Sequence, residues 1–312
     1  GNKQFNYGSL MIPVSKQKKS SAEVFKIVAA AQRKYNVPAY AVNTGFSLKG
    51  IDLGSNNFRA LKKPKAALLI GNGVSSYEAG EVWHLLDTRM NVPITKLQMS
   101  SFRRISLDRY NTLVMVSGSY MELDSVQRKK IKAWVAKGNT LITIARASKW
   151  VIDKKLVKEK LTKKPKDKEK DKKKVVERLP YVDAGNNGGR ERLGGAIFEV
   201  HLDVTHPLGF GYRSSSLPVY KNNMVFLAPT TSPYGTVAKY TKNPHIDGYI
   251  SDKNLNTFLK PSASLLVSAI GRGRVVLFAD NPNFRGSWYG TNRLFLNALF
   301  LGSRISVPRG TN

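Results

Sequence analysis

Residues 138–150 read GNTLITIARASKW, and this stretch decides how the fold is interpreted. Thr140–Ile144 is a short apolar run, which predicts a strand buried on both faces of a sheet. Ala145 and Arg146 then form a sharp turn, after which a helix begins. In many α/β enzymes the nucleophile stands in such a turn, at the carboxyl end of the sheet. Since neither alanine nor arginine can attack a substrate, the sequence predicts the scaffold of a catalyst without its attacking atom.

Strand–helix pairs on both sides of this stretch extend the pattern. Residues 65–70 form a continuous apolar run, and Ser75 with Glu78 forms a capping box that begins a helix. Residues 112–116 form another strand, and Gly138 ends the helix that follows it. This alternation predicts a doubly wound, mostly parallel sheet. The other expected elements are strands at 7–14, 39–43, 93–97, 196–204, 224–227, 236–240, 264–270 and 274–279, and helices at 20–35 and 291–301.

The chain is expected to have two parts of unequal size. Residues 1–62 form a βαβ-like lead-in segment, and residues 63–312 form the main domain. Within the main domain, residues 153–178 are rich in lysine and poor in apolar side chains, which predicts a basic, solvated and mobile excursion. Residues 184–195 are rich in glycine and asparagine and are expected to form a loop.

Charge and cysteine content limit the chemistry. Lysine and arginine total 51 against 21 acidic residues, a net charge of +30, and there is no cysteine. The absence of cysteine excludes disulfides, thiolate metal sites and a cysteine nucleophile. The positive excess would attract an acidic polymer or carbohydrate, although solubility alone is the simpler interpretation. No apolar run is long enough to cross a membrane, so no membrane span is expected.

Three further patterns suggest sites, and each has a simpler structural interpretation. The Gly71-x-Gly73-x-x-Ser76 turn resembles a phosphate cradle but lacks its third glycine, so a capped tight turn is preferred. His201, Asp203 and His206 could approach one another as metal ligands, or be polar groups at a strand end. Basic and aromatic residues near the end suit stacking on a sugar or a nucleic-acid base, or a packed corner: Arg272, Arg274, Phe284, Arg285, Trp288, Tyr289 and Arg293.

Three segments together carry a family resemblance: residues 71–83, residues 203–212 and residues 271–285. Over nearly the whole chain, the sequence resembles the carboxy-terminal region of bacterial secreted zinc carboxypeptidase-like proteins of the carboxypeptidase A type. That region is similar to a class I glutamine-amidotransferase-like, flavodoxin-like domain, here with β-rich additions in the C-terminal half. The resemblance implies zinc only in the parent peptidase domain, since the family's zinc-ligand pattern is missing from this chain. It also implies that the amidotransferase nucleophile would fall on Ala145 or Arg146.

The expected function is therefore that of a non-catalytic accessory domain. By the resemblance its partner is the peptidase domain of the same polypeptide, and its location is secreted or periplasmic. No cofactor and no metal are expected in this chain, and nucleic acid is not an expected partner. The expected contact surface is the carboxyl end of the sheet, formed by Asn72, Ser75, Ser117, Ser119, Arg146, Asn283, Arg285 and Trp288. The alternatives are a binding module for an acidic polymer or carbohydrate, and a hydrolase with a serine nucleophile at Ser117, Ser119 or Ser148.

Overall fold

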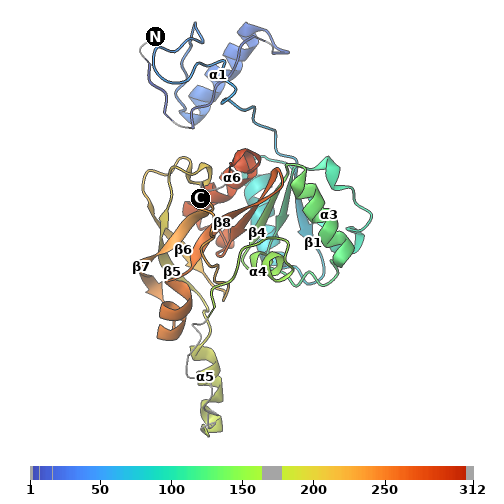
Figure 1. The fold of residues 1–312 in the computed structure, drawn as a ribbon, viewed down its shortest axis with the longest axis vertical. Helices are drawn as coiled ribbons and strands as arrows, with labels where there is room; N and C mark the ends of the chain where they lie inside the picture. The colour runs from blue at the N-terminus through green and yellow to red at the C-terminus, as the bar shows by residue number, and fades with distance from the viewer. Residues whose placement is uncertain (1–2, 7, 16, 164–177, 307–312) are drawn as a thin grey trace. The chain divides into compact units, whose positions relative to one another are not determined.

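A computed structural model describes residues 3–6, 8–15, 17–163 and 178–306 of the chain. It divides into two compact units, Gly1–Ala60 and Leu61–Asn312. The second unit contains every strand and both hydrophobic cores of the described residues. Figure 1 shows it as one continuous sheet with helices packed on its faces. The lysine-rich residues 164–177 lie outside the described residues.

In the first unit the structure contains one helix, α1 (Ser21–Tyr35), among the described residues. Ser20 and Glu23 form the expected capping box at its start. The strands expected at residues 7–14 and 39–43 are wrong, since the described residues of both ranges are not in strands. No described side chain of this unit is fully buried. An apolar run becomes a strand only where a neighbouring strand takes up its backbone hydrogen bonds, and this unit offers none.

The second unit is built on a mixed nine-stranded sheet with the order β2-β1-β3-β4-β9-β8-β7-β5-β6. The five strands from β2 to β9 pair in parallel, and the five from β9 to β6 pair in antiparallel fashion. The strands are β1 (Ala66–Ile70), β2 (Ile94–Gln98), β3 (Thr112–Met115), β4 (Thr140–Ile144), β5 (Ala196–Leu202), β6 (Ser216–Lys221), β7 (Thr236–Gly248), β8 (Ala263–Ile270) and β9 (Gly273–Phe278).

Helices cover both faces of the parallel half. On one face α2 (Ser76–His84) and α6 (Tyr289–Leu301) share a core with Leu68, Ile142 and Val276. On the other face α3 (Ser125–Ala136) and α4 (Arg146–Asp153) pack on the alternate residues of the same strands. This alternation follows from the two-residue repeat of a strand. α5 (Ala184–Arg190) is a short helix within the second unit.

The expected α/β class is confirmed. The expected mostly parallel sheet is not, since the strands from β2 to β9 pair in parallel and those from β9 to β6 pair in antiparallel fashion. The expected strand at 224–227 is wrong, since only Leu227 forms isolated bridges there. Residues 184–195 are not all loop, because α5 occupies their first part. Residues 153–163 are not a solvated excursion throughout, since Leu156 and Val157 are buried in the core.

Candidate functional site

The turn after β4 has the backbone conformation of a nucleophile elbow. Ala145 has φ 49° and ψ −112°, a region that side-chain-bearing residues rarely adopt. Its amide donates to the Phe278 carbonyl of β9 at 2.8 Å, and its carbonyl accepts from the Ser148 amide at 2.9 Å. Its methyl group is buried, with 1 % exposed. Of the two candidates for the elbow position, the structure selects Ala145, and Arg146 becomes the first residue of α4.

The amide that would stabilise an oxyanion is already engaged. In an elbow, the backbone N–H of the residue after the nucleophile is one of the oxyanion donors. Here the Arg146 amide donates to Ser117 Oγ at 3.3 Å. Ser117 is itself fixed, because its amide donates to Glu78 Oε2 at 2.8 Å and its carbonyl accepts from the Ser75 amide at 2.8 Å. The Ser117 hydroxyl therefore occupies the place of a substrate oxygen.

Two carboxylates on α2 face this edge of the sheet. Burial raises the pKa of Glu78 above its usual value, against the opposing effect of its hydrogen bonds from Ser117. Burial also raises the pKa of Glu81, which accepts from Asn281 Nδ2 at 2.5 Å and from the Arg285 amide at 2.6 Å. The two glutamates thus tie α2 to the loops after β3 and β9, and they serve as structural acceptors.

Strained residues mark the loops at the same edge. Tyr120 in the β3–α3 loop, Ala145 after β4 and Arg285 in the β9–α6 loop have φ values of 50°, 49° and 51°. A non-glycine residue at positive φ carries a cost that the surrounding contacts must offset, and such residues gather at functional sites. Three of the six described non-glycine residues at positive φ therefore lie on loops at this sheet edge.

The residues expected to form the contact surface divide into two groups. Three have internal roles: Ser75 caps α2, Ser117 bonds to the elbow, and Asn283 is fully buried. Five remain at least partly accessible, namely Asn72, Ser119, Arg146, Arg285 and Trp288. No ion pair within 4 Å involves Arg146 or Arg285 among the described residues.

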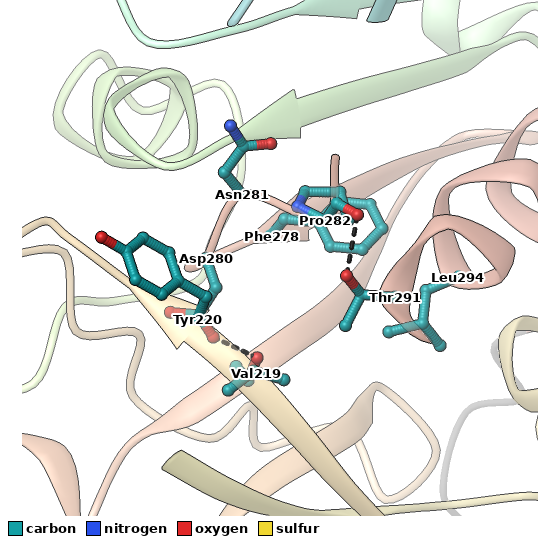
Figure 2. A pocket seen from close by; sticks show the side chains of 9 residues that line it. Val219, Tyr220, Phe278, Asp280, Asn281, Pro282, Thr291 and Leu294 are labelled. Atoms are coloured by element: carbon teal, nitrogen blue, oxygen red, sulfur yellow. Dashed lines mark hydrogen bonds between the residues drawn. The ribbon is translucent and has the colours of Figure 1, made fainter. Parts of the chain in front are cut away.

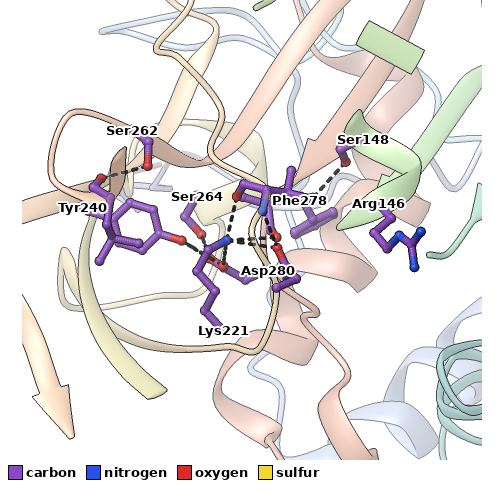
Figure 3. A network of polar contacts seen from close by, with 12 residues as sticks. Arg146, Ser148, Lys221, Tyr240, Ser262, Ser264, Phe278 and Asp280 are labelled. Atoms are coloured by element: carbon purple, nitrogen blue, oxygen red, sulfur yellow. Dashed lines mark hydrogen bonds and ion pairs between the residues drawn. The ribbon is translucent and has the colours of Figure 1, made fainter. Parts of the chain in front are cut away.

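A buried ionic cluster, which sequence patterns did not predict, lies beside the elbow. Lys221 Nζ and the Asp280 carboxylate are 3.1 Å apart, and both side chains are almost fully buried. The Tyr240 hydroxyl donates to Asp280 at 2.8 Å, and the Ser264 hydroxyl donates at 2.5 Å. Figure 3 shows these groups converging on Asp280 while the Arg146 side chain points away from them. The cluster joins β6, β7, β8 and the end of β9.

A small cavity adjoins this cluster. It has a volume of about 10 Å³ and is lined by Asp280, Asn281, Tyr220 and Thr291, among others. Figure 2 shows the Thr291 hydroxyl bonded to the Pro282 carbonyl on its wall, at 2.7 Å. A space of this size holds about one water molecule. It is therefore not a pocket for an organic ligand.

Other expected sites have structural roles. Ser148 is fully buried and donates to the carbonyls of Thr143 and Phe278, at 3.0 and 2.8 Å. No group of three or more metal-ligating side chains comes together in the described part of the chain, so His201, Asp203 and His206 form no such set. His206 instead caps a short helical turn, with Nδ1 accepting from the Leu208 amide at 3.0 Å.

The basic and aromatic residues near the C-terminus form a packed corner. The Phe284 ring stacks on Tyr220 with ring centres 3.7 Å apart, and Trp288 lies against the same tyrosine. The guanidinium of Arg89 lies over the Tyr289 ring, 4.1 Å from its centre. Because Tyr220, Phe284 and Trp288 pack on one another, these three rings do not form an open platform for stacking a ligand. Tyr289 remains 61 % exposed.

Comparison with known proteins gives only distant similarities. No protein-family model and no curated protein matches the chain. Among solved structures, a ThuA-like protein from Parabacteroides merdae is 14 % identical, with a TM-score of 0.49 over 80 % of this chain and 93 % of that one. A ThuA-like protein from Bacteroides uniformis is 13 % identical, with a TM-score of 0.41 over 78 % of this chain and 94 % of that one. A β-galactosidase from Bacillus circulans is 14 % identical, with a TM-score of 0.40 over 80 % of this chain and 32 % of the galactosidase.

These findings correct the resemblance to zinc carboxypeptidase-like proteins. The similar structures are ThuA-like proteins and glycosidases, and no carboxypeptidase-associated domain is among those compared above. The expected zinc-carboxypeptidase and metallopeptidase character is therefore wrong. Three shared segments without a chemical role were too little to identify a family. Among the described residues, no helix is both long and apolar enough to span a membrane.

Proposed function

We propose that this chain is a non-catalytic binding domain whose sheet edge keeps the form of a catalytic site. In this proposal the β2-to-β9 half corresponds to a doubly wound, flavodoxin-like sheet of the class I amidotransferase kind. A partner or ligand binds at the carboxyl ends of its strands, where such sheets bind their ligands. The accessible groups there are Asn72, Ser119, Arg146, Arg285 and, in part, Trp288.

The backbone geometry of the elbow is the main support for this proposal. Ala145 keeps the strained backbone that presents a nucleophile, yet its buried methyl group cannot attack a substrate. The Arg146 amide, which would stabilise an oxyanion, is bonded to Ser117. A site without a nucleophile and with its oxyanion donor occupied lacks the two groups on which acyl transfer depends.

A second candidate function is serine hydrolysis at Ser117. The Ser117 amide donates to the buried carboxylate of Glu78 at 2.8 Å, and the Ser117 side chain also bonds to that carboxylate. A serine next to an acceptor of this kind is the one arrangement among the three candidate serines that could be activated. Against it, only 9 % of Ser117 is exposed, and its hydroxyl accepts from the Arg146 amide.

Turnover measurements separate the two functions. The chain is assayed against ester, amide and glycoside substrates beside the variant Ser117→Ala. We expect both proteins to show the same background rate, because no group at the elbow takes part in a reaction. Ser119→Ala is the matched control, since this hydroxyl lies on the same loop and is exposed. A rate that is lost in Ser117→Ala and kept in Ser119→Ala would establish the hydrolase and remove the binding-domain proposal.

A further inference from the structure

Cationic side chains gather on the outer side of α3. Ile131, Trp134 and Val135 are buried against the sheet, which leaves Lys129 and Lys132 exposed on the solvent side of the helix. Residues 128–132 read RKKIK. A short basic run of this kind is typical of surfaces that hold nucleic acid or heparin-like polymers.

A second basic segment is fixed alongside this helix. Lys130 Nζ donates to the carbonyls of Phe102 and Arg103, each at 3.2 Å, and Trp134 Nε1 donates to the Leu107 carbonyl at 2.8 Å. These contacts hold residues 102–110 against α3. The segment carries Arg104 and Arg109, both exposed. We call the four exposed cations the α3 ridge: Arg104, Arg109, Lys129 and Lys132.

Among the described residues, no ion pair neutralises the charge of the α3 ridge. The nearby carboxylates of Asp108 and Asp124 are already paired with Lys137 and Arg103, at 3.1 and 3.5 Å. Within the described ranges, no carboxylate lies within 4 Å of the charged group of any ridge residue. A polyanion that contacts these cations would release its counterions, which favours binding.

We infer that the α3 ridge binds a linear acidic polysaccharide. The ridge offers no exposed ring for stacking, because Phe102 and Trp134 are buried and Tyr110 is half-buried, which disfavours single-stranded nucleic acid and neutral sugars. A flexible chain can follow both the helix and the segment beside it. Duplex DNA is stiff over roughly 150 base pairs and would touch only the crest of a convex helix. This surface is separate from the strand-end site and does not depend on it.

Charge reversal on the ridge tests this inference. Heparin binding is titrated at several salt concentrations with the full chain and with Lys129→Glu/Lys132→Glu. Because both side chains are exposed, the fold should be retained, as a thermal melt followed by circular dichroism will show. We expect affinity to fall by about tenfold or more, and the logarithm of affinity to depend less steeply on the logarithm of salt concentration.

A matched control distinguishes binding at the α3 ridge from attraction of heparin by the overall positive charge of the protein. Lys239→Glu/Lys242→Glu makes the same change in net charge at two exposed positions of β7, in the antiparallel half of the sheet. We expect this variant to bind heparin within about threefold of the unchanged chain. Equal losses in both variants, or no loss in the ridge variant, would overturn the inference. Tighter binding of duplex DNA than of heparin, lost through the same ridge residues, would overturn the choice of polymer.

Discussion

At the scale of single residues, Ala145 has the backbone conformation of a nucleophile elbow but a side chain that cannot act as a nucleophile. Its backbone is held at positive φ by bonds to Phe278 and Ser148, and no feature of alanine itself favours that conformation. The surrounding sheet therefore imposes the elbow whatever residue stands there. The position of this turn was predictable from the apolar run before it. The engagement of the Arg146 amide by Ser117 was not, because it depends on a contact between two separate strands.

The burial of His206 is expected to make the folded protein less stable in acid. Burial lowers its pKa to about 4, below the value of 6.5 for an exposed histidine, although Asp203 opposes the shift. Between these two pH values, His206 binds a proton more readily in the unfolded chain than in the folded one. Its contribution to the free energy of unfolding is therefore fully present above pH 6.5 and is lost as the pH falls toward 4. The contribution is about 3 kcal/mol.

His206→Asn tests this assignment, because the amide oxygen of asparagine can still accept from the Leu208 amide. Urea unfolding is measured for both proteins at about pH 7 and about pH 4. We expect the stability advantage of the unchanged chain to shrink toward the lower pH by roughly 3 kcal/mol. Parallel stability curves for the two proteins would show that His206 does not titrate in this way.

At the scale of elements, the antiparallel strands meet the parallel half through the Lys221–Asp280 cluster. Lys221 ends β6 and Asp280 follows β9, so one ion pair joins the edge strand of the sheet to its middle. The sequence did not predict β6 (Ser216–Lys221), which contains Pro218. The structure explains this residue, since β6 is an edge strand and an edge strand tolerates a proline.

Removing one partner of this buried pair should be strongly destabilising. Lys221→Met leaves the Asp280 carboxylate buried without its cation, and we expect a loss of about 3–5 kcal/mol in the free energy of unfolding. The double variant Lys221→Met/Asp280→Asn should lose less than the sum of the two single variants, because neither charge then remains. Urea denaturation measures the free energy of unfolding of Lys221→Met, Asp280→Asn and the double variant. Lys239→Met is the exposed control, which we expect to change that free energy by less than about 0.5 kcal/mol. Strictly additive losses would show that the two charges are not coupled.

At the scale of the whole molecule, local signals predicted the parallel half better than the rest. β1 is a continuous apolar run, and β3 and β4 combine apolar residues with threonine. The caps at Ser75 and Asp124 mark the starts of α2 and α3. The strands expected in residues 1–60 failed because apolar spacing says nothing about a pairing partner. The expected contact surface stays a prediction, and the contacts that hold its residues together could not be predicted from the sequence. Its contacts from Glu81 to Asn281 and Arg285 join residues 200 or more positions apart.

Two surfaces of the molecule then have distinct proposed roles. The strand-end edge of the sheet is the binding site with an inert elbow, and the α3 ridge is the site for an acidic polysaccharide. The strand-end proposal needs a scaffold that binds without reacting, so it depends on the inertness of the elbow.

Covalent labelling tests that claim most directly. The full chain is incubated with a fluorophosphonate, which modifies activated serine hydroxyls, and its intact mass is measured beside that of a known serine hydrolase. The account predicts an unchanged mass for this chain and a complete mass shift for the hydrolase. A single adduct mapped to Ser117, and absent from Ser117→Ala, would contradict it.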